Sequence, residues 1–224
     1  MKRHIPRYVT TCRSGSGGLP PGPRNRYGFT LVELLVVIAI LGVLSALVIT
    51  GTRTALARAA TVDCLSDLRQ MGIAVHMFVD DHDGRLPGTS HGVSWTNSLA
   101  GYLGEGFIGR CPAVPRHRAR ITYGWNDCLA MASGEGISVH MCSTPSLTMA
   151  IAEVATNQSS EHFHFMGVRG GASRLTPNQF RSSVNVEVHG AGANYLFIDG
   201  HVQTVPWADI QIRLTQSNPT LIVP

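Results

Sequence analysis

Histidine and aspartate residues near the C-terminus are the side chains best placed to do chemistry. His189 is followed after nine intervening residues by Asp199 and Gly200, and His201 comes next. Imidazole and carboxylate groups at this spacing suit zinc or another transition metal. Asp-Gly between two β-prone runs is also a strong hairpin signal, in which both residues take the positive φ of a type I′ turn. We favour this architectural interpretation, in which Asp199 forms the turn and His189 enters from the preceding strand or loop, and we expect no metal.

Two other clusters resemble metal sites less closely. Glu161, His162 and His164 offer one carboxylate and two imidazoles, and the two histidines would share one face of a strand. The segment Asp81–Gly84 begins like a calcium loop, but its twelfth position is Gly92 rather than a glutamate. We expect no cofactor, although a calcium or zinc ion is an open alternative.

Cysteine is the other residue type that could do chemistry, by forming disulfides or binding a metal. The chain has five: Cys12, Cys64, Cys111, Cys128 and Cys142. No two follow the C-x-x-C spacing of zinc ribbons and redox motifs. The four beyond Cys12 allow three connectivities, and we expect one disulfide within the set Cys111, Cys128 and Cys142, as suits an oxidising compartment.

The elements that must carry these residues begin with a basic leader and an apolar helix. Residues 1–28 contain six of the 18 basic residues and no acidic residue, so the remainder of the chain is slightly negative. This distribution gives no reason to expect nucleic-acid binding. Residues 29–50 form an apolar run, and about 20 helical residues span the hydrocarbon core of a bilayer. Basic residues on its N-terminal side predict that this side stays in the cytoplasm.

The helix should continue beyond the membrane as an amphipathic stalk over residues 51–80. Apolar residues recur there at steps of three and four, which predicts one buried stripe. Its members are Leu56, Ala60, Cys64, Leu68, Met71, Val75 and Phe78.

The head, residues 81–224, should be a small α+β domain with a mainly antiparallel sheet. A short helix is expected near Trp95, capped by Ser94 or Thr96. The strand-like runs are Ile121–Trp125, Thr148–Val154, His162–Val168 and Val184–Val188, and a hairpin should pair Tyr195–Ile198 with His201–Val205.

The junction "RYGFTLVE" resembles the N-terminus of type IV prepilins and of the pseudopilins of type II secretion systems. In that family a peptidase cuts after the glycine, the new terminal phenylalanine is N-methylated, and the fifth mature residue is glutamate. The corresponding residues are Gly28, Phe29 and Glu33. The resemblance implies that Glu33 of one subunit pairs with the α-amino group of Phe29 in its neighbour.

Two other interpretations of this segment compete with the prepilin one. An ordinary membrane anchor would let the Glu33 carboxylate reach the headgroups, because a charge inside the bilayer is costly. A secretory signal peptide would be cut near Ala55-Leu56-Ala57, but its apolar core should be only 7–15 residues long.

The C-terminal half resembles a group of prepilin-like proteins named for the His-nine residues-Asp-Gly spacing of His189, Asp199 and Gly200. Further similar pieces are "DDHDGRLP", Trp95 with Leu99 and Tyr102, Cys111-Pro112 and "TYGWN". The signature does not supply a biochemical role.

The resemblance implies a structural protein. The expected subunit assembles with itself and other pseudopilins into a pseudopilus or pilus-like filament, using a prepilin peptidase, an inner-membrane platform and an ATPase. It would cross the inner membrane once, with its head in the periplasm or outside the cell. The chain lacks G-x-S-x-G, P-loop and H-E-x-x-H motifs, so we expect no enzyme. The alternatives are a minor or tip pilin that binds a secreted substrate, sugar or metal, and a tethered hydrolase that uses the histidines.

Overall fold

A computed structural model describes most of the chain and divides it into two units. The described residues are 28–90, 92, 94–104, 107, 109–114, 121–165, 175–215 and 220–224. The units are Met1–Leu47 and Val48–Pro224. Helix α1, Leu31–Asp81, contributes to both units and confirms the long N-terminal helix. The expected leader lies outside the described residues except for Gly28.

In the first unit, a reciprocal pair of side-chain contacts begins helix α1. Glu33 Oε2 accepts hydrogen bonds from the Thr30 backbone N–H at 2.8 Å and from its hydroxyl at 2.9 Å. The Glu33 N–H donates to Thr30 Oγ1 at 3.2 Å. This is a capping box, in which Thr30 is the N-cap and Glu33 the third helical residue. It satisfies backbone donors that have no partner inside the helix.

The residues after this cap form an apolar surface on all sides of the helix. Every large apolar side chain from Leu31 to Ile49 is at least 46% exposed. The helix is long and apolar enough to cross a membrane. An apolar helix without a protein partner is stable in lipid because its backbone hydrogen bonds are satisfied internally. The apolar segment therefore supports membrane anchoring.

In the second unit, the C-terminal part of α1 packs against the head. The expected stripe is buried from Cys64 to Phe78, and Leu68 and Met71 have no exposed surface. Leu56 was wrongly placed in this stripe, because it is 64% exposed and lies outside the hydrophobic core. After Asp81 the backbone leaves the helix through Asp83 and Gly84, which both have positive φ.

The head is built on one five-stranded sheet. Its strands are β1 (Tyr123–Asn126), β2 (Met149–Glu153), β3 (His162–Phe163), β4 (Gly192–Phe197) and β5 (Val202–Pro206). Their order is β3-β1-β2-β4-β5, and only the pair β1–β3 is parallel. In the register Tyr123 pairs with Glu153, and Ala152 pairs with Tyr195. The prediction of a mainly antiparallel sheet is confirmed.

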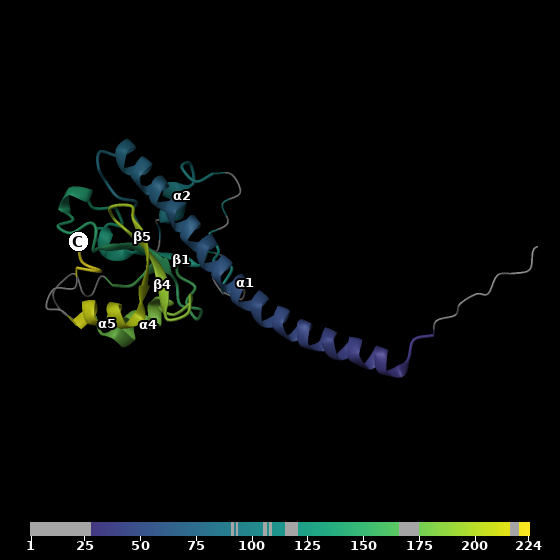
Figure 1. The fold of residues 1–224 in the computed structure, drawn as a ribbon. Coiled ribbons are helices and arrows are strands. Elements are labelled where there is room, and N and C mark those ends of the chain that lie inside the picture. The colour runs from purple at the N-terminus through teal and green to yellow at the C-terminus, as the bar shows by residue number, and fades with distance from the viewer. Residues whose placement is uncertain are drawn as a thin grey trace, which may run out of the picture. The chain divides into compact units, whose positions relative to one another are not determined.

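Helices cover both faces of this sheet (Figure 1). On one face α1, α2 (Trp95–Leu99) and the buried Tyr123 and Trp125 share one hydrophobic cluster. On the other face α4 (Pro177–Ser183) and α5 (Trp207–Thr215) pack over a second cluster. Two short 3-10 helices, η1 (Asp127–Leu129) and η2 (Val139–Met141), lie in the connections. The architecture is α+β, with the sheet between two helical layers.

Two expected strands are shorter than the sequence indicated. From the run His162–Val168 only His162–Phe163 is a strand, and residues 166–168 lie outside the described part. The run Val184–Val188 contributes a single bridge, from Val184 to Val154. Val184 has an extended backbone, but its N–H still bonds to the Phe180 carbonyl at the end of α4, and residues 186–189 form a turn, so a longer strand is not possible there. The short helix near Trp95 is confirmed, but the Ser94 side chain does not cap it.

The C-terminal hairpin has the expected strands and a different turn. Leu196 pairs with Val202, and the Phe197 N–H bonds to the His201 carbonyl, so the loop has three residues rather than two. Gly200 has φ +88°, whereas Asp199 does not adopt positive φ. The predicted type I′ turn is therefore wrong, and the loop is the three-residue kind that ends in a left-handed glycine. Asp199 still stabilises the turn, because its Oδ1 accepts the His201 N–H at 3.2 Å.

We predict that Gly200→Val lowers the melting temperature of the detergent-solubilised chain. A side chain at positive φ costs about 1–2 kcal/mol, or roughly 2–8 °C for a domain of this size. A Cβ at Gly200 would also lie 2.6 Å from His76 Nε2 on α1. Gly190→Val is the matched control, because Gly190 has φ +84° and no atom near the added Cβ. An equal or smaller loss for Gly200→Val would contradict the contact with α1.

Candidate functional site at the junction of helix α1 and the sheet

A disulfide joins helix α1 to the head. Cys64 and Cys111 are bonded, with their Cα atoms 5.4 Å apart and a sequence separation of 47 residues. The expected disulfide within Cys111, Cys128 and Cys142 is therefore wrong. Cys128 and Cys142 are buried and form no disulfide among the described residues. The prediction placed Cys64 on the buried stripe but did not show that the stripe faces Cys111.

A buried pair of ionisable side chains, Glu153 and His189, lies beside this disulfide, and we call it the buried couple. His189 Nε2 is 2.8 Å from Glu153 Oε1, and the two side chains are 1% and 0% exposed. Glu153 is the last residue of β2, and His189 precedes β4 in a turn. The second carboxylate oxygen of Glu153 accepts the Asn194 backbone N–H at 3.3 Å. Burial raises the pKa of Glu153, while the hydrogen bonds from His189 and Asn194 oppose this shift.

The hydrogen bonds of Thr61 determine which ring nitrogen of His189 carries a proton. The Thr61 hydroxyl donates to the Ala57 carbonyl at 3.1 Å, so its oxygen remains as an acceptor for His189 Nδ1 at 3.2 Å. His189 Nδ1 therefore carries a proton. His189 Nε2 and Glu153 Oε1 are 2.8 Å apart, and two unprotonated acceptors would repel at that distance, so they share one further proton and the couple has no net charge whichever group holds it. This neutrality limits the cost of burying two ionisable groups.

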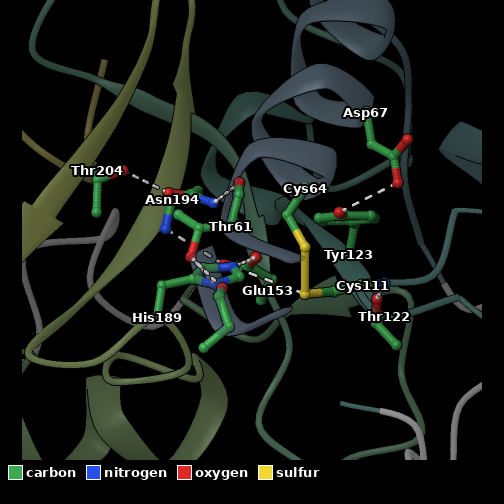
Figure 2. Close-up of polar contacts among 11 residues, drawn as sticks. Thr61, Cys64, Asp67, Cys111, Thr122, Tyr123, Glu153, His189, Asn194 and Thr204 are labelled. Carbon is green, nitrogen blue, oxygen red and sulfur yellow. Dashed lines mark hydrogen bonds and ion pairs between the residues drawn. A yellow bond between two sulfur atoms is a disulfide. The ribbon is translucent and has the colours of Figure 1, made fainter. Parts of the chain in front are cut away.

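Neighbouring side chains hold the couple and the disulfide in place (Figure 2). The Asn194 side chain donates to the Thr61 carbonyl at 3.4 Å and accepts from the Thr204 hydroxyl at 2.6 Å. The Cys111 N–H donates to Thr122 Oγ1 at 2.7 Å. These contacts tie α1, β4, β5 and the loop of Cys111 to one buried point.

A second polar contact between α1 and the sheet lies nearby. The Tyr123 hydroxyl donates to Asp67 Oδ2 at 3.4 Å (Figure 2). Burial raises the pKa of Asp67 and, together with nearby carboxylates, raises that of Tyr123 well above its usual range. Tyr123 therefore remains a protonated donor at any physiological pH.

The structure does not bring His189 together with Asp199 and His201. His201 Nδ1 lies 2.6 Å from Asp199 Oδ1 on the exposed turn, whereas His189 turns toward Glu153. Asp199 contacts the backbone of its own turn, because its Oδ1 accepts the His201 N–H, so its architectural role stays our interpretation. The role of His189 was missed, because Glu153 was not recognised as its partner.

The other residues that the sequence suggested as metal ligands contact groups outside this site. Glu161 Oε2 accepts from the hydroxyls of Ser94 at 2.6 Å and Thr96 at 3.3 Å. The rings of His162 and His164 lie edge to face, with their centroids 4.7 Å apart.

Asp81, in the segment that resembles a calcium loop, accepts from the Tyr102 hydroxyl at 3.0 Å. In the described part of the chain, one group of three or more potential ligands converges: Cys64, Cys111, Glu153 and His189, whose donor atoms all lie within 4.8 Å of one another.

Glu153 and Thr61 are the site residues that sequence reasoning missed. Glu153 is the one acid in the apolar run "TMAIAEV", and a carboxylate in a strand that is buried on both faces needs a partner. That signal was present, but the identity of the partner depends on how the strands are ordered.

Comparison with known proteins bears on the N-terminal segment. Residues 23–49 match the family model described as the prokaryotic N-terminal methylation motif. This match includes Gly28, Phe29 and Glu33 and supports a type IV prepilin-like precursor. No curated protein and no solved structure matches the chain. The chain therefore carries a prepilin-type N-terminal segment, and the C-terminal His/Asp-Gly signature stays a resemblance.

We predict that His189→Ala destabilises the head far more than His201→Ala. Removing one partner of a buried pair leaves the other uncompensated, which costs about 3–5 kcal/mol. The exposed pair of His201 with Asp199 contributes at most about 1 kcal/mol. Denaturant unfolding of the oxidised full chain measures both effects. A loss for His189→Ala as small as that for His201→Ala would contradict the central role of the buried couple.

Proposed function

We propose that this chain is a structural subunit of a type IV pilus-like filament or a type II secretion pseudopilus. The methylation motif at residues 23–49 is the observation that carries this proposal. The chain would have no enzymatic activity of its own, and its biochemical work would be polymerisation. A partner ATPase would supply the energy for extraction from the bilayer, because the chain has no nucleotide-binding motif of the P-loop type.

The apolar surface of α1 supports a role in a helical bundle. Its large apolar side chains between Leu31 and Ile49 are exposed in the single chain and would contact lipid before assembly and other copies of α1 afterwards. Further along α1, the exposed residues Val62, Ile73 and Met77 lie within about 60° of one another around the helix. They would offer the second unit an apolar contact with a neighbouring subunit.

The proposed topology follows from the charge of the leader. Six basic residues precede Gly28, so the N-terminus would remain on the cytoplasmic side of the inner membrane. A prepilin peptidase on that side would cut after Gly28. The head would then lie in the periplasm, where the Cys64–Cys111 disulfide is chemically stable.

Glu33 would have two tasks in this mechanism. Within one chain its Oε2 completes the capping box with Thr30. Its other oxygen, Oε1, would accept a hydrogen bond from the N-terminal amine of Phe29 in an adjacent subunit. Pairing an ammonium with a carboxylate removes two charges from an apolar environment and sets the register between subunits.

Processing gives the first test. When the chain is produced with its cognate prepilin peptidase, its mature form should begin at N-methylated Phe29, because Gly28 immediately precedes the apolar helix. Intact-mass analysis of the membrane-extracted protein measures this terminus, and an inactive peptidase is the control. An uncut Met1, or a terminus near Arg58, with active peptidase would refute the proposed processing.

Two matched substitutions separate the tasks of Glu33. Glu33→Gln retains the capping box, for which glutamine is also suited, but removes the negative charge. It should be inserted and processed normally but should assemble poorly, as Glu33→Ala should. Thr30→Ala removes the capping hydroxyl, retains the charge and should preserve assembly at a cost of about 1 kcal/mol in helix stability. Filament yield is measured after shearing, and a normal yield from Glu33→Gln would exclude the charge pairing.

A further inference from the structure

We propose that, when Cys64 and Cys111 are thiols, the protein binds one zinc ion at the junction of α1 and the sheet, through Cys64, Cys111, His189 and Glu153. The same two sulfur atoms form the disulfide, so metal binding and disulfide formation are mutually exclusive states of one site. The inference concerns the second unit, Val48–Pro224, and does not depend on the proposed filament function.

The donor set is appropriate for zinc. Two thiolates, one imidazole and one carboxylate are ligand types that zinc accepts in a tetrahedral site. Zn–S distances near 2.3 Å and Zn–N distances near 2.0 Å place neighbouring donor atoms about 3.3–3.8 Å apart. Here all four donors lie within 4.8 Å of one another, and His189 Nε2 is 3.6 Å from Cys111 Sγ. In the thiol form the two sulfur atoms are no longer bonded, and rotation of the Cys64 and Cys111 side chains would bring all four donors to these separations.

The protonation of His189 also suits a metal ligand. Because Nδ1 donates its proton to Thr61 Oγ1, the lone pair of Nε2 becomes available when the shared proton leaves. Metal-binding histidines usually donate their other ring N–H in this way, which fixes the orientation of the ring. Thr61 would be a positioning residue in this site, since it acts through His189.

The remaining ligands are similarly held by neighbouring groups. Glu153 Oε2 accepts the Asn194 N–H at 3.3 Å, which leaves Oε1 directed at His189 and the sulfur atoms. The Cys111 N–H is bound to Thr122 Oγ1 at 2.7 Å. Figure 2 shows the four potential ligands pointing toward one another from α1, β2 and two loops.

An ion has a route to the site. A cavity of about 530 Å³ is lined by Ala57, Thr61, Pro112 and His189, among other residues. His189 is one of its lining residues, and the buried His189 ring contacts Glu153 and Cys111 Sγ, so the cavity lies next to the donor group. On our proposal an ion enters through this cavity when His189 moves.

The test uses the full chain with its cysteines kept in the thiol form from synthesis onward. The chain is made by cell-free translation into detergent micelles with a phosphine reductant, and in parallel with oxidised glutathione, which forms the disulfide. Each preparation is incubated with Zn²⁺ or Co²⁺ and freed of loose metal by gel filtration. We expect one equivalent of metal in the thiol form and less than a tenth of that in the disulfide form. Bound Co²⁺ should show a thiolate-to-metal charge-transfer band.

Substitutions assign the ligands. In a Cys128→Ala, Cys142→Ala background, which removes the other two head cysteines, the equivalent of zinc should be retained. Adding Cys64→Ser or His189→Ala should abolish it, whereas adding His201→Ala, on the exposed turn, should not. Thr61→Val, which preserves the shape but removes the hydroxyl, should weaken zinc binding by about 10–100-fold.

Two results would overturn the inference. The first is a thiol-form wild-type chain that retains no metal and gives no charge-transfer band with Co²⁺, a measurement that needs no substituted protein. The second is a retained equivalent of zinc that survives Cys64→Ser, because the ion would then bind elsewhere.

Discussion

A buried carboxylate at the end of strand β2 is the constraint on which the arrangement of the head depends. Glu153 has no exposed side-chain surface, and its two oxygens require donors from His189 and from the backbone of Asn194. An unsatisfied buried carboxylate would cost several kcal/mol, which is comparable to the whole stability of a small domain. The turn before β4 and the register of β2 with β4 must therefore be formed together.

The site around Glu153 also joins helix α1 to the sheet. Thr61 contacts the ring of His189, and Cys64, one turn further along α1, is bonded to Cys111. A covalent bond and a hydrogen-bond network at one location restrict sliding of α1 across the sheet, which hydrophobic packing alone permits more easily. In the proposed filament, such a link would transmit force from the bundled helices to the head.

At the other end of α1, the capping box gives Glu33 a role within a single chain. A carboxylate at the third helical position satisfies a backbone donor and interacts favourably with the positive end of the helix dipole. This local role and the proposed contact with a neighbouring amine use different oxygen atoms. One glutamate near the start of an apolar helix therefore serves the helix before assembly and, on our proposal, the filament after it.

The local features of the protein were determined by the sequence itself. The apolar helix, the buried stripe from Cys64 to Phe78, the antiparallel hairpin and the Gly28-Phe29 junction depend on residue type and short spacing, which are visible in a linear pattern. The pairing of Cys64 with Cys111 and of Glu153 with His189 was decided only by the tertiary structure. These partners are 47 and 36 residues apart, and they meet because the strand order places β2 next to β4 beneath α1. No local periodicity specifies that order, since it results from burying both faces of the sheet at once.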